Sequence, residues 1–208
     1  MVILMFVDIS DAIKFLEKNS KFKLLVEQLG PVSLNVRRLN YESLIKIIIN
    51  QQLSNKVANV IFSRLKKMFS SSKIISPDCI LKTNVEDLRK IGISYTKINF
   101  MKNLAIKVKN NTKIFYYWKK LNDQDAKNEI QKLNGFGPWS SNIILLFYMG
   151  RLDIFPEGDS TLKKGYQKIF NKKLDKDFSQ VKWAKPYRSI LAIYIWKWVD
   201  NGMIALKN

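Results

Sequence analysis

Apolar residues recur at helical spacing along most of this chain. Ala58, Ile61 and Leu65 form one such set, and similar sets are found in the segments before and after it. A step of three or four residues places side chains on one face of an α-helix, whereas the strict alternation expected of a β-strand is not sustained anywhere. The pattern therefore predicts an all-α protein.

Capping residues, glycines and prolines divide this pattern into separate helices. Ser, Thr and Asp side chains favour the position just before a helix, and proline is tolerated in its first turn. Residues 32–40 lack the pattern and are expected to form a linker with a short extended segment. Helices are expected to begin at or near Ser10, Phe22, Tyr41, Ser54, Pro77, Thr83, Ser94, Asp123, Pro138, Asp159 and Pro186.

Residues 133–150 contain the most informative turn. Gly135 and Gly137 can adopt backbone angles that are closed to other residues, which a tight turn between two helices requires. Pro138 suits the start of the apolar helix that follows, and Gly150 suits its end. Such a turn leaves backbone amides pointing outward at a helix N-terminus, which favours binding of a phosphate group.

The composition adds a strong positive charge. The 208 residues include 36 Lys and Arg but only 17 Asp and Glu, which gives a net charge of +19. An AT-rich genome accounts for part of the lysine content but not for the scarcity of acidic residues, so nucleic acid is the expected partner. The apolar content of 47% is typical of a globular protein.

Two absences from the sequence exclude whole classes of chemistry. The chain has no histidine, which excludes a Ser-His-Asp triad and histidine-ligated zinc. Its one cysteine, Cys79, cannot form a disulfide framework or a four-cysteine iron–sulfur cluster. No apolar run is long enough to span a membrane, and we expect an intracellular protein that makes no membrane contact.

Four motifs together resemble the helix-hairpin-helix DNA glycosylase superfamily. Residues 133–140 (LNGFGPWS) resemble its hairpin, and residues 155–159 (FPEGD) resemble the segment that carries its catalytic aspartate. Residues 49–54 (INQQLS) and 185–189 (KPYRS) resemble two further motifs of the 3-methyladenine DNA glycosylase II branch, whose members act on alkylated bases. The four motifs occur in the order expected for that branch and cover most of the chain.

The resemblance implies the helix-hairpin-helix glycosylase fold, with two helical lobes around a cleft. One lobe is expected to comprise residues 41–151, and the other is expected to combine residues 1–40 with residues 152–208. The hairpin departs from the usual pattern at two positions, because Asn134 replaces a proline and Phe136 is larger than the usual residue.

The resemblance also implies that Asp159 is the catalytic residue. The alternative is that Asp159 caps a helix and has no other role. Trp139 lies 20 positions before it, as in the alkylated-base branch, and stands where bifunctional relatives carry a nucleophilic lysine. A monofunctional enzyme that leaves an abasic site is therefore implied. Trp139, Tyr194 and Trp196 are expected to line the base pocket or, alternatively, to belong to the core. Ile143 replaces an aromatic residue that relatives often carry, which leaves the base preference open.

Several residues are implied to contact DNA or to fix the lobes. Gln52 is expected to fill the gap that a flipped nucleotide leaves in the duplex. Arg188 is expected to form a buried ion pair that fixes the lobes. For each polar turn residue and each lysine, simple exposure to solvent is the alternative. The residues expected to bind DNA are Gln51, Gln52, Gly135, Gly137, Ser140, Lys163, Lys164 and Lys185.

One inorganic ligand is implied by the same resemblance. The backbone carbonyl groups of Gln131, Leu133 and Phe136 are expected to hold a Na⁺ or K⁺ ion at the hairpin. No other cofactor is expected to be required, and no iron–sulfur cluster is expected.

The implied activity is hydrolysis of the N-glycosidic bond of alkylated bases, such as 3-methyladenine and 7-methylguanine, flipped out of duplex DNA. The expected partner is double-stranded DNA with damaged bases, bound by a monomer that is located with the DNA in the nucleoid or nucleus. Two alternatives are a non-catalytic helix-hairpin-helix module that binds DNA and a glycosylase for deaminated or oxidised bases.

Overall fold

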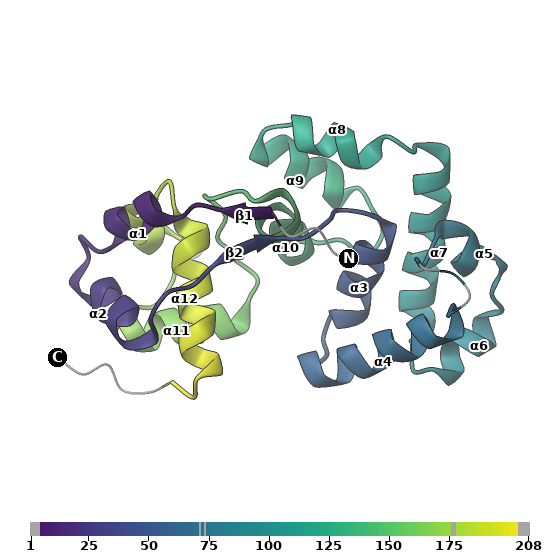
Figure 1. Cartoon of the computed structure of the whole chain (residues 1–208), viewed down its shortest axis with the longest axis horizontal. Coiled ribbons are helices and arrows are strands. Elements are labelled where there is room, and N and C mark those ends of the chain that lie inside the picture. The colour runs from purple at the N-terminus through teal and green to yellow at the C-terminus, as the bar shows by residue number, and fades with distance from the viewer. Residues whose placement is uncertain (1–4, 71, 73, 176–177, 204–208) are drawn as a thin grey trace. The chain divides into compact units, whose positions relative to one another are not determined.

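The computed structural model describes residues 5–70, 72, 74–175 and 178–203, and these residues are mostly helical (Figure 1). Most of the helices begin at or near the positions that capping residues and prolines predict, and the strands, α8 and η1 are additional elements. The strands are β1 (Met5–Val7) and β2 (Leu34–Val36). The helices are α1 (Ser10–Leu16), α2 (Ser20–Leu29), α3 (Tyr41–Asn50), α4 (Asn55–Met68), α5 (Pro77–Lys82), α6 (Val85–Lys90), α7 (Tyr95–Asn110), α8 (Ile114–Lys120), α9 (Asp123–Gln131), α10 (Pro138–Met149), α11 (Ser160–Phe170), the 3-10 helix η1 (Ser179–Ala184) and α12 (Arg188–Asp200).

The chain folds into two compact units. The central unit comprises Arg38–Ser140, and the terminal unit combines Met1–Arg37 with Ser141–Asn208. The first boundary is close to the expected one at residues 40 and 41. The second falls inside α10 rather than after residue 151, because the later turns of that helix pack within the terminal unit. There the carbonyl of Phe147 accepts a hydrogen bond from the amide of Arg37 at 2.8 Å.

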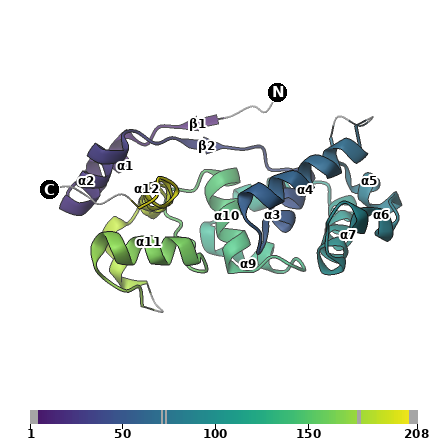
Figure 2. The same ribbon diagram turned by 90° about the horizontal axis from the view of Figure 1, so that it is seen from below.

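In the terminal unit, α12 is the central element of the core. It packs against α1, α2, α11 and η1, and α11 lies beside it in both views (Figure 1, Figure 2). Close packing with α11 depends on Gly165, where an added Cβ would lie 2.5 Å from a methyl group of Ile195. The fully buried α12 residues are Ser189, Ile190, Leu191, Ala192, Tyr194 and Ile195.

A short antiparallel sheet in the terminal unit is predicted only in part, because residues 32–40 are expected to include a short extended segment but no pairing with β1; the helices α8 and η1 are not predicted at all. β1 pairs with β2 in a register that places Phe6 opposite Asn35. Each strand has only three residues, which is too short for an alternating pattern to stand out in the sequence. The all-α assignment nevertheless holds for the fold, since helices supply nearly all of the core.

In the central unit, α3 and α7 form the framework. α3 packs on α4 and α7, while α5 and α6 also pack on α7. The hydroxyl group of Tyr41, at the start of α3, donates a buried hydrogen bond to the carbonyl of Met101 in α7 at 3.0 Å. The two helices are therefore joined by a specific polar contact as well as by apolar packing.

Most expected helix starts are confirmed by their capping contacts. Ser54 and Ser94 cap α4 and α7, as predicted. The predicted cap is wrong at α1, where Ser10 is the first helical residue rather than the cap, and at α6, where the cap is Asn84 rather than Thr83. It is also wrong at α9, where the side chain of Asn122, one residue earlier than predicted, is the cap. The last helix, α12, begins at Arg188 rather than at Pro186. Among the described residues, no helix has the length and apolar character needed to cross a membrane.

Candidate functional site

The hairpin between α9 and α10 depends on one glycine rather than two. Gly135 has a φ of +86°, and an added Cβ would lie 2.3 Å from the ring of Phe100. The expectation that Gly137 also needs a special backbone angle is wrong, because its φ lies outside the left-handed region and space around it is open. The turn is closed by a hydrogen bond of 3.1 Å from the amide of Phe136 to the carbonyl of Leu133.

The side chain of Gln51 is bound to this hairpin. Its Nε2 donates hydrogen bonds to the carbonyl of Gly135 at 2.7 Å and to the hydroxyl of Ser140 at 3.0 Å. Ser140 is only 3% exposed. The expectation that the side chains of Gln51 and Ser140 contact DNA is therefore not supported, since both are engaged within the protein. Gln52, in contrast, is exposed at the tip of the turn.

Lys97 in α7 is a site residue that the sequence analysis did not identify. Its Nζ donates hydrogen bonds to the carbonyls of Ile49 and Gln51, both at 2.8 Å. Helix ends leave carbonyls without intrahelical partners, and Lys97 supplies donors to two of them at the end of α3. Partial burial lowers the pKa of this lysine. One lysine among many gives no sign of this role in the sequence.

Asp159 is held firmly at the start of α11. Its Oδ1 accepts a hydrogen bond from the amide of Leu162 at 2.7 Å, so the residue is the helix cap that the sequence predicts. Its own amide donates to the carbonyl of Pro156 at 3.0 Å. The side chain is half-buried, and the helix N-terminus favours its negative charge. The carboxylate is thus placed by backbone contacts on both sides of it.

The loop that leads to Asp159 is anchored by the buried residue Ser189. The hydroxyl of Ser189 in α12 accepts a hydrogen bond from the amide of Ile154 at 2.9 Å and donates one to the carbonyl of Arg151 at 2.7 Å. On the other side, Nδ2 of Asn142 in α10 donates to the carbonyl of Phe155 at 3.4 Å. Two helices therefore fix the backbone of this loop.

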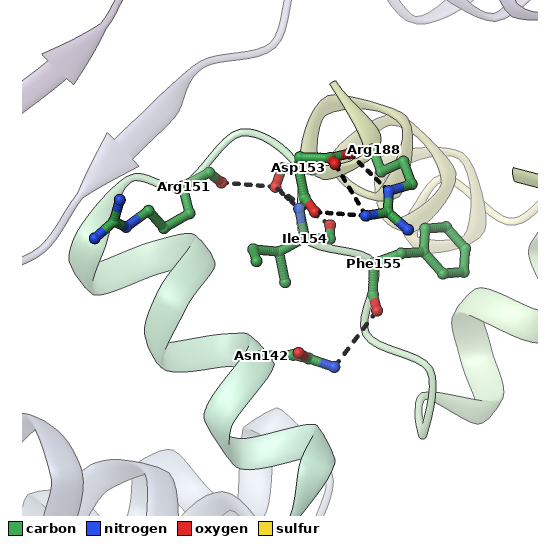
Figure 3. A network of polar contacts seen from close by, with 7 residues as sticks. Asn142, Arg151, Asp153, Ile154, Phe155 and Arg188 are labelled. Atoms are coloured by element: carbon green, nitrogen blue, oxygen red, sulfur yellow. Dashed lines mark hydrogen bonds and ion pairs between the residues drawn. The ribbon is translucent and has the colours of Figure 1, made fainter. Parts of the chain in front are cut away.

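An ion pair adds a third anchor to the same loop. Arg188 binds both carboxylate oxygens of Asp153, from Nε at 2.6 Å and from Nη2 at 2.9 Å, and also donates to the backbone carbonyl of Asp153 at 3.1 Å (Figure 3). Both residues belong to the terminal unit. The expectation that Arg188 joins two lobes is therefore corrected, since its role is to hold the loop before Asp159.

We expect Arg188→Ala to lower the free energy of unfolding by about 2 kcal/mol, because the variant leaves a half-buried carboxylate without its bidentate partner. Chemical denaturation of Arg188→Ala, Asp153→Ala and the double variant gives the coupling energy between the two side chains. Arg188→Lys is the control that keeps the charge but not the bidentate geometry. A coupling energy near zero would contradict the anchoring role.

Comparison with known proteins identifies the family to which this chain belongs. The family model of the HhH-GPD superfamily base excision DNA repair proteins matches residues 45–184, which is more than half of the chain. The chain belongs to the HhH-GPD superfamily. This confirms the relationship that the four sequence motifs indicate, and the matched range includes the turn at residues 51–54, the hairpin and Asp159.

Two relatives and one solved structure show how far the similarity extends. The alkylbase DNA glycosidase-like protein mag2 of Schizosaccharomyces pombe is 29% identical over 86% of this chain and 88% of its own length. DNA-3-methyladenine glycosylase 1 of the same organism is 28% identical over 76% and 71%. The structure of the S. pombe 3-methyladenine DNA glycosylase Mag1 in complex with abasic DNA superimposes with a TM-score of 0.80 at 25% identity, covering 96% of this chain and all of that one.

Within this HhH-GPD protein, the three aromatic residues expected in a base pocket have different surroundings. Trp139 is half-buried in the first turn of α10. Trp196 is also half-buried and stacks on Phe147 with ring centres 5.8 Å apart. Tyr194 is fully buried, 5.0 Å from the ring of Phe22, and burial raises the pKa of its hydroxyl. Tyr194 is thus a core residue, which does not support its expected place in a pocket wall.

The three lysines expected to bind DNA are all exposed. Nζ of Lys163 lies 5.6 Å from the centre of the Phe178 ring, so a cation–π contact orients its side chain. Lys164 is the next residue of α11, and Lys185 precedes α12. Exposure is compatible with phosphate contacts, and the role of these lysines stays a prediction.

The hairpin carbonyls are chemically suited to a monovalent cation. Gln131 is the last residue of α9, and the carbonyl of Leu133 has a second lone pair beyond its bond to Phe136. Neutral carbonyl oxygens match the preference of Na⁺ and K⁺, and this site also stays a prediction. In the part of the chain that the structure describes, no group of three acidic, cysteine or histidine residues is arranged to hold a metal ion.

Proposed function

We propose that this chain is a monofunctional DNA glycosylase of base excision repair, which hydrolyses the N-glycosidic bond of alkylated bases in duplex DNA. The relatives named above as 3-methyladenine glycosylases support 3-methyladenine as a substrate. 7-Methylguanine is a second candidate of the same cationic class. The observation that carries the proposal is the anchored position of Asp159, which follows the hairpin and caps α11.

The chemistry requires a carboxylate that does not move during the reaction. Cleavage of an N-glycosidic bond develops positive charge on the sugar, as in the oxocarbenium-like transition state of glycoside hydrolysis. A preorganised carboxylate stabilises that charge and can orient or deprotonate the attacking water. Asp159 meets this requirement because backbone contacts hold it. A cationic alkylated base leaves easily, so a second acid is not needed.

Trp139 determines what the enzyme does after the base has left. An indole cannot form a Schiff base with the sugar, so the reaction stops at an abasic site without cutting the strand. Its flat, electron-rich face can attract a cationic base, with a free energy of about 0.5–2 kcal/mol.

The direct test is incubation of the wild-type protein with methylated duplex DNA, followed by chromatography of the released bases. We expect free 3-methyladenine and an abasic strand that breaks only after alkali treatment. Duplexes with uracil, hypoxanthine or 8-oxoguanine test the other substrate classes. Binding of duplex DNA without release of any base would favour the non-catalytic DNA-binding module instead.

The net charge of +19 predicts a specific response to salt. The logarithm of DNA affinity should fall linearly with the logarithm of salt concentration, and loss of one phosphate contact should reduce the slope by about one. Lys163→Met is expected to show this change in fluorescence anisotropy titrations. Lys18→Met is a matched control, because Lys18 makes a similar contact with the ring of Phe15 at 5.2 Å. Equal slopes for both variants would exclude Lys163 from the interface.

A further inference from the structure

The turn at residues 51–54, between α3 and α4, is called the Gln52 turn. Three residues of the central unit join it to the hairpin, and we call these residues, Gln51, Lys97 and Phe100, the Lys97 cluster. Lys97 binds the carbonyls of Ile49 and Gln51 at the end of α3, both at 2.8 Å. A charged donor makes stronger hydrogen bonds than a neutral one. The end of α3 is therefore fixed to α7 directly before the turn begins.

The other two members connect the turn and α7 to the hairpin. The side chain of Gln51 bridges from the turn to the carbonyl of Gly135 and the hydroxyl of Ser140, at 2.7 and 3.0 Å. Phe100 lies three residues after Lys97 in α7, and its ring occupies the space where a side chain at position 135 would stand. Turn, helix and hairpin are thus joined pairwise by contacts within one unit.

The backbone at Gln52 shows why such support is needed. This exposed residue has a φ of +56°, in the left-handed region that non-glycine residues rarely adopt. Such a conformation persists only where neighbouring contacts determine it. The bonds from Lys97 to the carbonyl of Gln51 and from Gln51 to the hairpin act on the residue directly before Gln52.

We propose that Lys97 and Gln51 are positioning residues that hold the Gln52 turn at a fixed place beside the hairpin, so that Gln52 meets the gap in a duplex from which a base has been flipped. The proposal rests on the proposed glycosylase function. It assigns Gln51 an internal role and leaves Gln52 as the residue that faces the DNA.

The test separates positioning from simple loss of charge. Affinity is measured for a duplex with a tetrahydrofuran abasic-site analogue and for the same duplex without it, using the wild type, Lys97→Met and Lys102→Met. Lys102 is in the same helix but outside the cluster. Its variant therefore removes an equal charge and leaves the contacts of the cluster in place. We expect Lys97→Met to reduce the preference for the abasic duplex about tenfold, whereas Lys102→Met weakens binding to both duplexes equally. Lys97→Arg should restore most of the preference, because its guanidinium can donate to both carbonyls.

The other outcomes test the positioning role of Lys97 separately from the proposed glycosylase function. If the wild type releases methylated bases and Lys97→Met behaves like Lys102→Met, the positioning role is wrong while the proposed function stands. If the wild type releases no base, the proposed function itself fails. If circular dichroism shows that Lys97→Met is unfolded, Gln51→Met decides instead. A folded Gln51→Met variant with undiminished preference for the abasic duplex overturns the proposal, and a similar tenfold loss supports it.

Discussion

Replacement of Asp159 by asparagine is expected to lower the single-turnover rate of base release by at least about a hundredfold, the range seen when a key electrostatic group is removed from an active site. Asparagine has nearly the same shape and is an equally good helix cap. The hydrogen bond to the amide of Leu162 can therefore be kept, and the folded structure should be retained. What the variant loses is the negative charge that we propose stabilises the developing oxocarbenium ion.

Two further variants separate the charge at position 159 from other effects. Glu157→Gln removes the same charge two residues earlier in the same loop, and we expect it to change the rate by less than about threefold, because a partly exposed loop carboxylate is well screened by water. Asp159→Ala removes both the charge and the cap, and should in addition lose about 1 kcal/mol of stability. Rates come from chromatographic detection of freed 3-methyladenine, and stability from chemical denaturation. Equal rates for Asp159→Asn and the wild type would reduce Asp159 to a structural cap.

The parts of this site that the sequence predicts are those determined by local contacts. A helix cap links residues only three positions apart, as between Asp159 and Leu162, so the residue type and its neighbours suffice to identify it. Ser54 and Ser94 were predictable for the same reason. The family motifs add the expected catalytic role of Asp159, which the local pattern alone leaves open between a cap and a catalytic group.

The parts that the sequence does not predict depend on residues far apart in the chain. Gln51 is 84 positions from Gly135 and 89 from Ser140, and Lys97 is 46 from Gln51. A polar residue in a turn has the same sequence pattern whether its side chain faces DNA or the protein. Hence the sequence pattern wrongly assigns the side chains of Gln51 and Ser140 to DNA contacts and gives no sign of the role of Lys97. The partner of Arg188 was unpredictable for the same reason, since Asp153 is 35 positions away.

The hairpin shows the same limit at the level of the backbone. Two glycines two positions apart predict a tight turn, but the sequence does not show which of them has a left-handed backbone. The structure assigns that conformation to Gly135, where the ring of Phe100 also excludes a side chain, and leaves open space at Gly137. Substitution at these two positions should therefore have very different effects.

Exchange of Gly135 for alanine is expected to weaken binding of duplex DNA about a hundredfold. An alanine with a φ of +86° costs about 1–2 kcal/mol, and displacement of the Phe100 ring, 2.3 Å from the new Cβ, costs about 1–3 kcal/mol more. The hairpin relieves this strain by moving, which displaces the amides proposed to bind phosphate and the carbonyl that Gln51 binds. A loss of about 2.7 kcal/mol in binding free energy corresponds to a hundredfold change in Kd.

Gly137→Ala and a double variant identify the source of the effect. Because a Cβ at position 137 meets no protein atom within 4 Å, Gly137→Ala should leave the free energy of unfolding within about 0.5 kcal/mol of the wild type. Combining Phe100→Ala with Gly135→Ala removes the steric overlap but not the backbone strain, so it should recover part of the duplex affinity relative to Gly135→Ala alone. Affinity is measured by fluorescence anisotropy at one fixed salt concentration, since phosphate contacts depend strongly on salt. If Gly135→Ala matches Gly137→Ala in both stability and affinity, the turn does not require its left-handed glycine, and the proposed phosphate site cannot depend on that conformation.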